Sequence, residues 1–250
     1  MMWLASMICQ WSLAASNMLV WPVYQTIEAD QRGSILWLEN RGKNDVTLQI
    51  RILRWSQKDQ QDVYADQQDV LASPPFMVVP AGQRQIVRLL RQIDMSPQQE
   101  SAYRIVIDEI PAQQTKPTQP MIGLNLQMRY VLPLFMQGDG IWTAERTDKK
   151  RDLKTAAQPQ LSWSIETKGN QHFLVLVNQG KVHARISNVF FGDNNNIGQA
   201  TAVVRIGLLG YVLPEKKMAW TLAKDQKIPS DKKLFIQLED NRPAIEIPKN

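Results

Sequence analysis

The residue types that most often do chemistry in proteins are scarce in this sequence and poorly spaced for it. His172 and His183 are the only histidines, and neither has Cys, Asp or Glu at the spacing of a metal site. Asp108 and Glu109 are adjacent, and neighbouring strand residues point to opposite faces, so they are badly placed to act as an acid–base pair. The sole cysteine, Cys9, lies in the apolar N-terminal segment. We therefore expect structural histidines, no catalytic residue and no bound metal.

The sequence also lacks the motifs of nucleophilic and nucleotide-dependent chemistry. It contains no G-x-S-x-G, no H-E-x-x-H and no glycine-rich phosphate loop. The net charge is +5, but Lys and Arg are scattered among acids except in DKKRDLK at 148–154. No aromatic residues interleave with that cluster, so we interpret it as a solvated linker and not as a nucleic-acid or lipid patch. The composition favours a protein that is not an enzyme, with no cofactor and no nucleic-acid partner.

The elements that carry these residues are predicted to be β-strands. Apolar and polar residues alternate in segments such as VTLQIRILRW at 46–55, and turn residues separate the segments, as in RGKND at 41–45 and PAGQ at 80–83. No helical period of useful length competes with this alternation. Several short strands at regular spacing predict an all-β fold of the sandwich type.

A break in composition divides the chain. Residues 138–160 are polar, rich in lysine and without sustained alternation, and strand patterns resume beyond them. We expect a first domain over 17–138, a linker over 139–160 and a second β-sandwich domain over 161–250.

The N-terminal segment resembles a secretory signal. Residues 1–16 are apolar and uncharged, with small side chains at Ala14 and Ser16, although the usual positive residues at the start are missing. A buried first strand or a membrane anchor are the alternatives, but about 16 residues is short for a membrane span. We interpret 1–16 as a signal peptide, which leaves a mature chain without thiols that suits an oxidising compartment.

One stretch, MIGLNLQMRYVLPLF at 121–135, alternates for longer than an ordinary strand. Its large apolar residues at every second position are Ile122, Leu124, Leu126, Met128, Tyr130, Leu132 and Leu134. At about 3.3 Å per residue the strand would be about 50 Å long. An apolar edge of this kind invites aggregation unless a partner covers it, and 122–128 contains no charge or proline to protect it. Beyond Tyr130 both faces become apolar, which indicates a strand enclosed by its own domain; the alternative is that all seven residues are simply core.

Three stretches in this order and spacing resemble the N-terminal domain of the periplasmic pilus-assembly chaperones, the PapD-like group of the chaperone–usher pathway. They are SPPFMVVPAGQRQIVRLLR at 73–91, YRIVIDEIP at 103–111 and QMRYVLPLF at 127–135. The stretches at 21–42 and 49–55 resemble more specifically the archaic branch, whose members accompany Csu-type and spore-coat-U-like pilins. The resemblance implies two immunoglobulin-like domains in a boomerang arrangement, a fold that by itself hosts many functions.

The resemblance also implies a binding strand. In that family the last strand of the first domain lends apolar side chains to a pilin subunit that lacks its own final strand, which is a form of β-augmentation. Carried onto this sequence, the donor residues are Ile122, Leu124, Leu126 and Met128, while the apolar residues from Tyr130 onward pack in the chain's own core. Fully burying four such side chains is worth about 6–10 kcal/mol at about 1.5–3 kcal/mol each, before ordering costs.

Basic residues of the family anchor the subunit's C-terminal carboxylate in the cleft between the domains. Here Pro133 stands where better-known members carry a lysine, and the first strand lacks their arginine. Arg104 is our first candidate and Arg51 the second, because a guanidinium forms two parallel charged hydrogen bonds to a carboxylate. The alternative for each is an exposed strand arginine. Glu109 matches an acid of an interdomain salt-bridge set and is expected to be structural.

The leading hypothesis is a periplasmic chaperone, not embedded in the membrane, that folds and caps pilin subunits and delivers them to an outer-membrane usher. The alternative is a structural immunoglobulin-like component of a surface, pilus or spore coat. Such subunits carry a detachable N-terminal donor segment, whereas the alternating strand here is internal. A carbohydrate-binding sandwich would need clustered exposed aromatics, and Trp142, Trp163 and Trp220 are too scattered to favour it.

Overall fold

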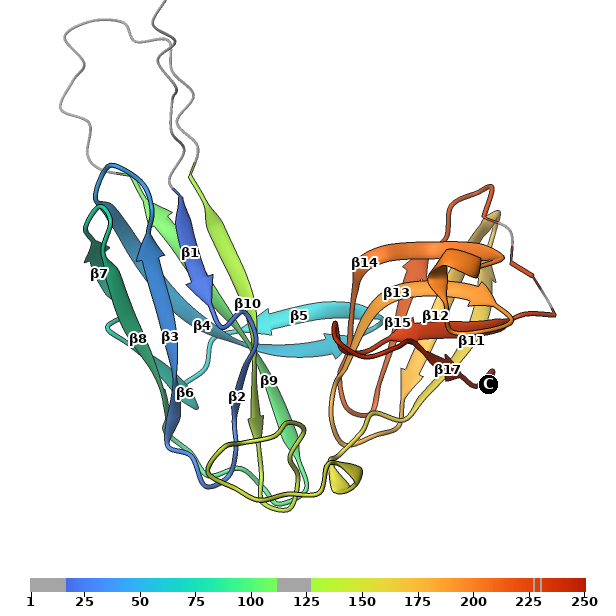
Figure 1. Ribbon diagram of the computed structural model, residues 1–250, viewed down its shortest axis with the longest axis horizontal. Helices are drawn as coiled ribbons and strands as arrows, with labels where there is room; N and C mark the ends of the chain where they lie inside the picture. Colours follow the sequence, from blue (N-terminus) through green and yellow to red (C-terminus); the bar gives the residue numbers. More distant parts are fainter. Residues whose placement is uncertain (1–16, 112–126, 227, 230) are drawn as a thin grey trace, which may run out of the picture.

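The computed structural model describes residues 17–111, 127–226, 228–229 and 231–250 of the chain. In these ranges every regular element is a β-strand except two short 3-10 turns, η1 (Leu153–Thr155) and η2 (Ile197–Gln199). The all-β prediction is therefore confirmed. Figure 1 shows two lobes joined at an angle. The predicted signal segment, 1–16, lies outside the described residues.

The first domain packs two sheets face to face. One sheet has the order β1 (Met18–Trp21), β3 (Gly33–Asn40), β8 (Arg84–Arg91), β6 (Val70–Ser73). The other has the order β2 (Gln25–Ile27), β10 (Arg129–Gln137), β9 (Glu100–Ile110), β4 (Val46–Lys58), β5 (Gln61–Ala65), and β7 (Phe76–Val79) also pairs with β4.

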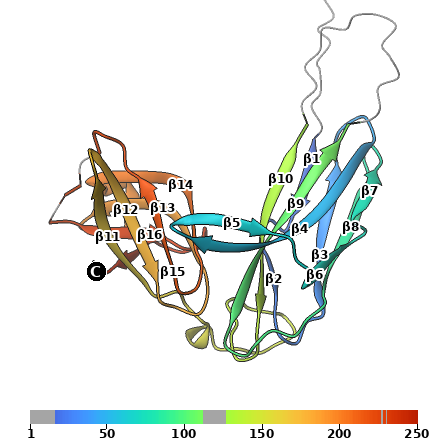
Figure 2. The ribbon, with the colours of Figure 1, turned by 180° about the vertical axis from the view of Figure 1, so that it is seen from behind.

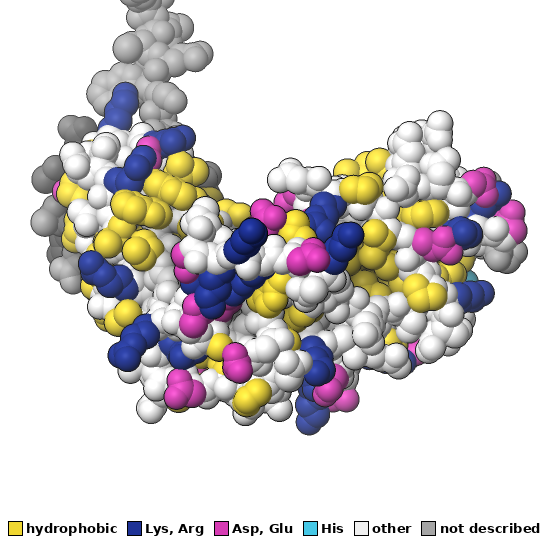
Figure 3. Space-filling model, turned by 60° about the horizontal axis from the view of Figure 1, so that its bottom comes forward, with side chains coloured by type: hydrophobic (Ala, Val, Ile, Leu, Met, Phe, Trp, Pro, Cys, Tyr) yellow, Lys and Arg dark blue, Asp and Glu magenta, His cyan; other side chains and the backbone are white. Residues whose placement is uncertain are grey.

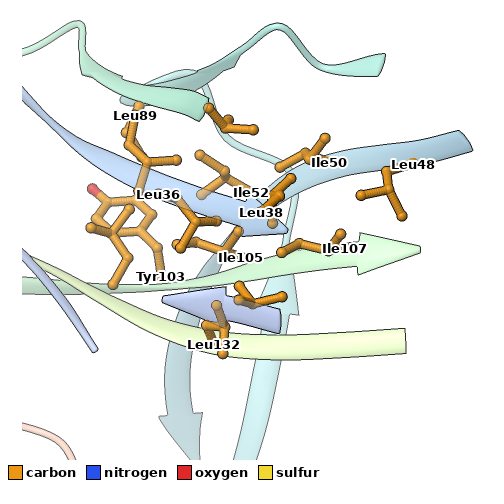
Figure 4. Packing of buried hydrophobic residues seen from close by; sticks show 14 of the residues in the cluster. Leu36, Leu38, Leu48, Ile50, Ile52, Leu89, Tyr103, Ile105, Ile107 and Leu132 are labelled. Carbon is orange, nitrogen blue, oxygen red and sulfur yellow. The ribbon is translucent and has the colours of Figure 1, made fainter. Parts of the chain in front are cut away.

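The core of this domain follows from the alternation in the sequence. On β4 the apolar positions Leu48, Ile50 and Ile52 are buried, whereas Arg51 between them is exposed. They pack against Leu36 of β3 and other residues of both sheets, as Figure 4 shows. Burying each such side chain contributes about 1.5–3 kcal/mol, so the period-2 pattern fixes which face of the strand turns inward.

The two predicted turns are present and have identifiable causes. Gly82 adopts φ +70° in the PAGQ turn, where Gln83 N donates to Pro80 O at 3.0 Å. The RGKND turn is held by Asn40, which is fully buried: its side-chain amide donates to Val79 O at 2.9 Å, and its Oδ1 accepts from Gly42 N at 2.9 Å.

The second domain is again a pair of sheets. One has the order β11 (Leu161–Lys168), β12 (Gln171–Asn178), β15 (Lys216–Thr221), and the other β14 (Ala202–Val212), β13 (Ala184–Gly192), β16 (Lys233–Gln237), β17 (Ile245–Ile247). Asn178 has the same role in this domain as Asn40 has in the first. It is fully buried, donates to Val182 O at 2.8 Å and Val212 O at 3.1 Å, and accepts from Gly180 N at 2.9 Å.

Removing the Asn178 amide should destabilise the second domain. We expect Asn178→Ala to lower its free energy of unfolding by about 2–4 kcal/mol, because several buried main-chain groups lose their only side-chain partner. Urea unfolding followed by tryptophan fluorescence measures this. Asn194→Ala, which removes exposed hydrogen bonds of the same domain, should cost less than about 0.5 kcal/mol. Equal effects of the two variants would contradict this account of Asn178.

The segment between β10 and β11 is docked on the first domain. Arg151 Nη1 donates to Glu28 Oε1 at 2.8 Å, and Arg146 Nη1 donates to Glu28 Oε2 at 3.0 Å and to Asp30 Oδ1 at 2.7 Å. Hydrogen bonds from Arg146 and Lys149 hold the pKa of Asp30 well below its ordinary value. The expectation of a solvated basic cluster is thus wrong for Arg151, whose side chain is only 12% exposed, because a buried glutamate of the first domain pairs with it.

No described segment of the chain forms a helix long and apolar enough to cross a membrane.

Candidate functional site

The strand β10 has an open edge over the first half of its length. β9 pairs with all of it, from Arg129 to Gln137, whereas β2 pairs in parallel only with the residues from Leu134 to Met136. Within the described residues, the outer edge of 129–133 therefore has no neighbouring strand. An unpaired strand edge is a template for a strand from another molecule.

The direction of the main-chain groups on β10 follows from one hydrogen bond. Glu109 N donates to Met128 O at 3.1 Å, and the direction alternates along an antiparallel pair. The N–H and C=O groups of Arg129 and Val131 therefore point to the open edge. Pro133 occupies the same kind of position, where its missing N–H interrupts no hydrogen bond to β9. A proline that would be disruptive in a central strand is thus tolerated here.

The side chains of β10 divide between two environments. Leu132 and Leu134 are buried in the core of the first domain and Tyr130 packs partly against it, which confirms the prediction for these three residues. On the other face Phe135 is fully buried, but against a histidine ring of the second domain, and Val131 is 48% exposed. The expectation that the strand from Tyr130 onward is enclosed by its own domain is therefore wrong for its outer face. There the second domain covers Phe135, and Val131 is exposed to solvent.

Three of the predicted donor residues, Ile122, Leu124 and Leu126, lie outside the described residues. Met128, the fourth, is described and directly precedes β10. Its side chain is 39% exposed. It therefore stands at the start of the open edge with apolar surface available for contact.

A cavity of about 550 Å³ lies between the domains beside this open edge. Its walls carry apolar side chains of both domains together with an arginine and two acids; they include Tyr24, Val131, Pro133, Arg185, Glu239 and Asp240. Arg185 is paired with Asp240 at 2.8 Å. Figure 3 shows hydrophobic, basic and acidic side chains intermixed in the region between the lobes. The cavity is therefore suited to an apolar chain segment.

Arg104 lies on the cleft-facing side of β9, held between aromatic rings. Its guanidinium carbon is 3.6 Å from the ring centroid of Trp55 on β4 and 5.2 Å from that of Tyr211 in the second domain. No ion pair of the described residues involves Arg104, and its buried Nε has no hydrogen-bond partner. An uncompensated guanidinium at the edge of a cleft is a favourable place for an anion.

Arg51 differs from Arg104 in its partners. Its Nη2 pairs with Asp108 Oδ2 at 2.7 Å, and Arg129 pairs with the other oxygen of the same carboxylate. Hydrogen bonds from these two arginines hold the pKa of Asp108 below its ordinary value against the opposing effect of burial. The side chain of Arg51 is 45% exposed, so its charge is both partly neutralised and largely hydrated. Arg104 is therefore the better placed of the two candidates.

A buried polar cluster joins the two domains at the base of the cleft. Glu100 Oε1 accepts from His183 N and from His183 Nδ1, both at 2.8 Å, and Glu100 Oε2 accepts from Gln137 at 3.0 Å. Tyr24 OH contacts His183 Nε2, and Phe135 stacks on the imidazole with centroids 3.4 Å apart. Burial, with a smaller contribution from Glu100, raises the pKa of the Tyr24 phenol well above its ordinary value. The Tyr24 phenol is therefore protonated at neutral pH.

Glu109, predicted to be the interdomain acid, lies at the opposite end of β9 from Glu100. It is beside Met128, whose N–H is 3.4 Å from Glu109 Oε2. The carboxylate that reaches the second domain is that of Glu100. Both residues lie on the same strand, so the sequence pattern alone could not tell which end of the strand meets the second domain.

A hairpin makes a second connection between the domains. Figures 1 and 2 show β4 and β5 extending together from the first domain to the second. Gln57, which is buried, donates to Tyr211 O and accepts from Leu213 N, each at 2.9 Å. No sequence pattern indicates this role, because a glutamine near the end of an alternating strand looks like an ordinary exposed polar residue. In the described part of the chain, no three His, Cys, Asp or Glu side chains gather into a metal site.

Residues 23–141 match the family of pili and flagellar-assembly chaperones, PapD N-terminal domain. The match begins just before β2 and ends just beyond β10, so it includes the open edge and Arg104. Among curated protein sequences, no significant match to the chain is found.

Solved structures extend the likeness to both domains. The chain is 29% identical to CsuC in the CsuC–CsuE complex of chaperone and tip adhesion subunit from archaic chaperone-usher Csu pili of Acinetobacter baumannii, over 94% of this chain and 99% of that one, with a TM-score of 0.72. The SafB chaperone with SafA pilin from Salmonella enterica gives 16% identity, 92% and 94% coverage and a TM-score of 0.61. The CupB2 chaperone of Pseudomonas aeruginosa gives 14% identity, 93% and 100% coverage and a TM-score of 0.57. The last two establish the fold alone; together the matches confirm the architecture of two immunoglobulin-like domains.

Proposed function

The chain carries, in residues 23–141, the PapD N-terminal domain of the pili and flagellar-assembly chaperones, and on this basis we propose that it binds, folds and caps pilin subunits by donor-strand complementation. The protein acts in the periplasm and hands its subunits to an outer-membrane usher. The likeness to CsuC favours subunits of the archaic, spore-coat-U-like type. No nucleotide is required, because a better-fitting strand of the next subunit replaces the chaperone strand.

The observation that carries this proposal is the open edge of β10. Over 129–133 the strand is paired on one side only, and it continues directly from the alternating segment 122–128. A subunit that lacks one strand can pair with this edge through main-chain hydrogen bonds, while Ile122, Leu124, Leu126 and Met128 fill its exposed core. Both partners then cover apolar surface that would otherwise promote aggregation.

Co-expression in the bacterial periplasm tests the proposal. A pilin subunit expressed alone should be degraded or aggregate, whereas with this chain it should be recovered as a soluble one-to-one complex. Adding a peptide that corresponds to the donor segment of the following subunit should then release the chain. Recovery of this chain from shed surface fibres, with no soluble complex, would favour the alternative, a structural component of the pilus or coat.

Arg104 is proposed to bind the C-terminal carboxylate of the subunit, with Arg51 as the second candidate. We expect Arg104→Ala to weaken subunit binding by about 10- to 100-fold, because charged hydrogen bonds of this kind contribute about 1.5–3 kcal/mol. Fluorescence anisotropy with a labelled subunit measures the change. Arg104→Lys should recover only part of the affinity, since an ammonium cannot make the bidentate contact.

The matched control is Arg51→Ala, which removes an exposed arginine from the same sheet face. Because Arg51 is already paired with Asp108, we expect its loss to change affinity by less than about threefold. An unchanged affinity for Arg104→Ala, or a larger loss for Arg51→Ala, would remove Arg104 from the carboxylate site.

A further inference from the structure

We infer that Gln57 and Asp62, on the hairpin of β4 and β5, are positioning residues that hold Arg104 ready for the subunit's carboxylate, with Tyr211 of the second domain as the opposing wall. The inference rests on the proposed function and adds to it a dependence on the second domain. Neither Gln57 nor Asp62 has to touch the subunit. They act on binding through the rings that surround Arg104.

The rings around Arg104 come from two domains. Trp55 lies flat beneath the guanidinium at 3.6 Å, and Tyr211 stands edge-on to Trp55, with an interplanar angle of 87° and centroids 5.3 Å apart. Stacking on aromatic faces stabilises a guanidinium without neutralising its charge, so the cation stays available to an anion. Burial and the nearby Asp62 raise the pKa of the Tyr64 phenol, and the charge of Arg104 and a hydrogen bond from it partly offset that rise.

Asp62 connects the hairpin residues on this face. The register pairs Trp55 with Tyr64 and Gln57 with Asp62, so these four side chains share one side of the hairpin. Asp62 Oδ1 accepts from Trp55 Nε1 and from Gln57 Nε2, both at 2.9 Å, and Oδ2 accepts from Tyr64 OH at 3.4 Å. One carboxylate therefore fixes the ring beneath Arg104 and the amide that reaches the second domain.

Gln57 fixes the position of Tyr211, which lies on the second-domain side of Arg104. Its amide makes two hydrogen bonds of 2.9 Å to the main chain of the second domain, one at Tyr211 O and one at Leu213 N. Around them Trp55, Tyr211 and Leu213 form a buried apolar cluster with Phe135 and Ala102. The distance between the Tyr211 ring and Arg104 is thus set by a side chain of the first domain. Displacing Tyr211 would release one side of the guanidinium and add an ordering cost to binding.

A double-mutant cycle separates positioning from a merely structural role. The four proteins are the unmodified chain, Gln57→Leu, Arg104→Ala and the double variant, and the measured quantity is the affinity for a purified subunit. We expect Gln57→Leu to weaken binding about five- to tenfold when Arg104 is present and less than about twofold when it is absent. The same loss should vanish with a subunit whose C-terminal carboxylate is replaced by an amide. If the fold-loss in affinity of the double variant equals the product of the fold-losses of the two single variants, Gln57 does not act through Arg104 and the inference is overturned.

A second variant covers the case in which Gln57→Leu folds poorly. Asp62 is exposed, so Asp62→Ala should fold, and it should show the same dependence on Arg104. Asp66→Ala, which removes an exposed carboxylate outside this hairpin cluster, is the control and should leave affinity unchanged. If Gln57→Leu and Asp62→Ala both bind subunits with normal affinity, only this inference is overturned. If the unmodified chain binds no subunit, the proposed function is overturned as well.

Discussion

Replacing Leu124 and Leu126 together by arginine is expected to abolish the capture of pilin subunits. In the proposed complex each of these side chains fills an apolar pocket of the subunit, and burying each contributes about 1.5–3 kcal/mol. Losing two of them costs about 3–6 kcal/mol, or about 10²- to 10⁴-fold in affinity. Two charges that cannot be hydrated in the pockets add to this loss. Subunit recovered with the affinity-tagged chain from the periplasm should fall to background.

The same segment supplies a matched control on its other face. Asn125→Arg with Gln127→Arg introduces the same charge within the same few residues, but at the polar positions of the alternation. These side chains point away from the subunit if the segment is a donor strand, so co-purification should change by less than about threefold. If both double variants lost the subunit equally, charge and not the pattern of side chains would be responsible, and strand donation would be wrong.

Local rules predicted the fold well because each element follows from its own residues. The alternation on β4 placed Leu48, Ile50 and Ile52 in the core, and the PAGQ turn needed a glycine with positive φ at Gly82. Each of these features depends only on a few neighbouring residues and on which face of the strand is apolar. A single sequence contains that information, and the all-β prediction depended on nothing else.

Contacts between the domains were the part that the sequence could not predict. Arg104 was proposed from its residue type, but the rings beside it come from β4 and from the second domain, far away in sequence. The prediction that His183 is structural is confirmed, but nothing in the sequence indicates that Glu100 is its carboxylate partner. Buried polar pairs between domains have no spacing rule, because two independent sandwiches can be joined at many angles. Only the relative placement of the domains shows which polar residues meet.

Removing the Glu100 carboxylate should weaken the buried polar contact that joins the two domains. Glu100→Ala leaves His183 Nδ1 and main-chain N without an acceptor in a buried site, and the Gln137 amide keeps only its hydrogen bond to Thr143. Breaking one partner of such a buried arrangement costs about 3–5 kcal/mol. We expect the two domains to unfold in separate transitions, and the distribution of distances between spin labels on the two domains to broaden. Calorimetry and pulsed electron paramagnetic resonance measure these effects.

Glu100→Gln is the control that keeps the shape of the side chain. Its carbonyl oxygen can still accept from His183, and its new NH₂ can donate to Gln137 Oε1, a buried atom that has no hydrogen-bond partner in the native junction. Turning the Gln137 amide over supplies that contact, so Glu100→Gln should cost less than half of what Glu100→Ala costs. If the two variants were equally destabilising, the negative charge of Glu100 would be what joins the domains. If neither broadened the distance distribution, the β4–β5 hairpin alone would be sufficient to hold the cleft, and subunit binding would then depend on Gln57 far more than on Glu100.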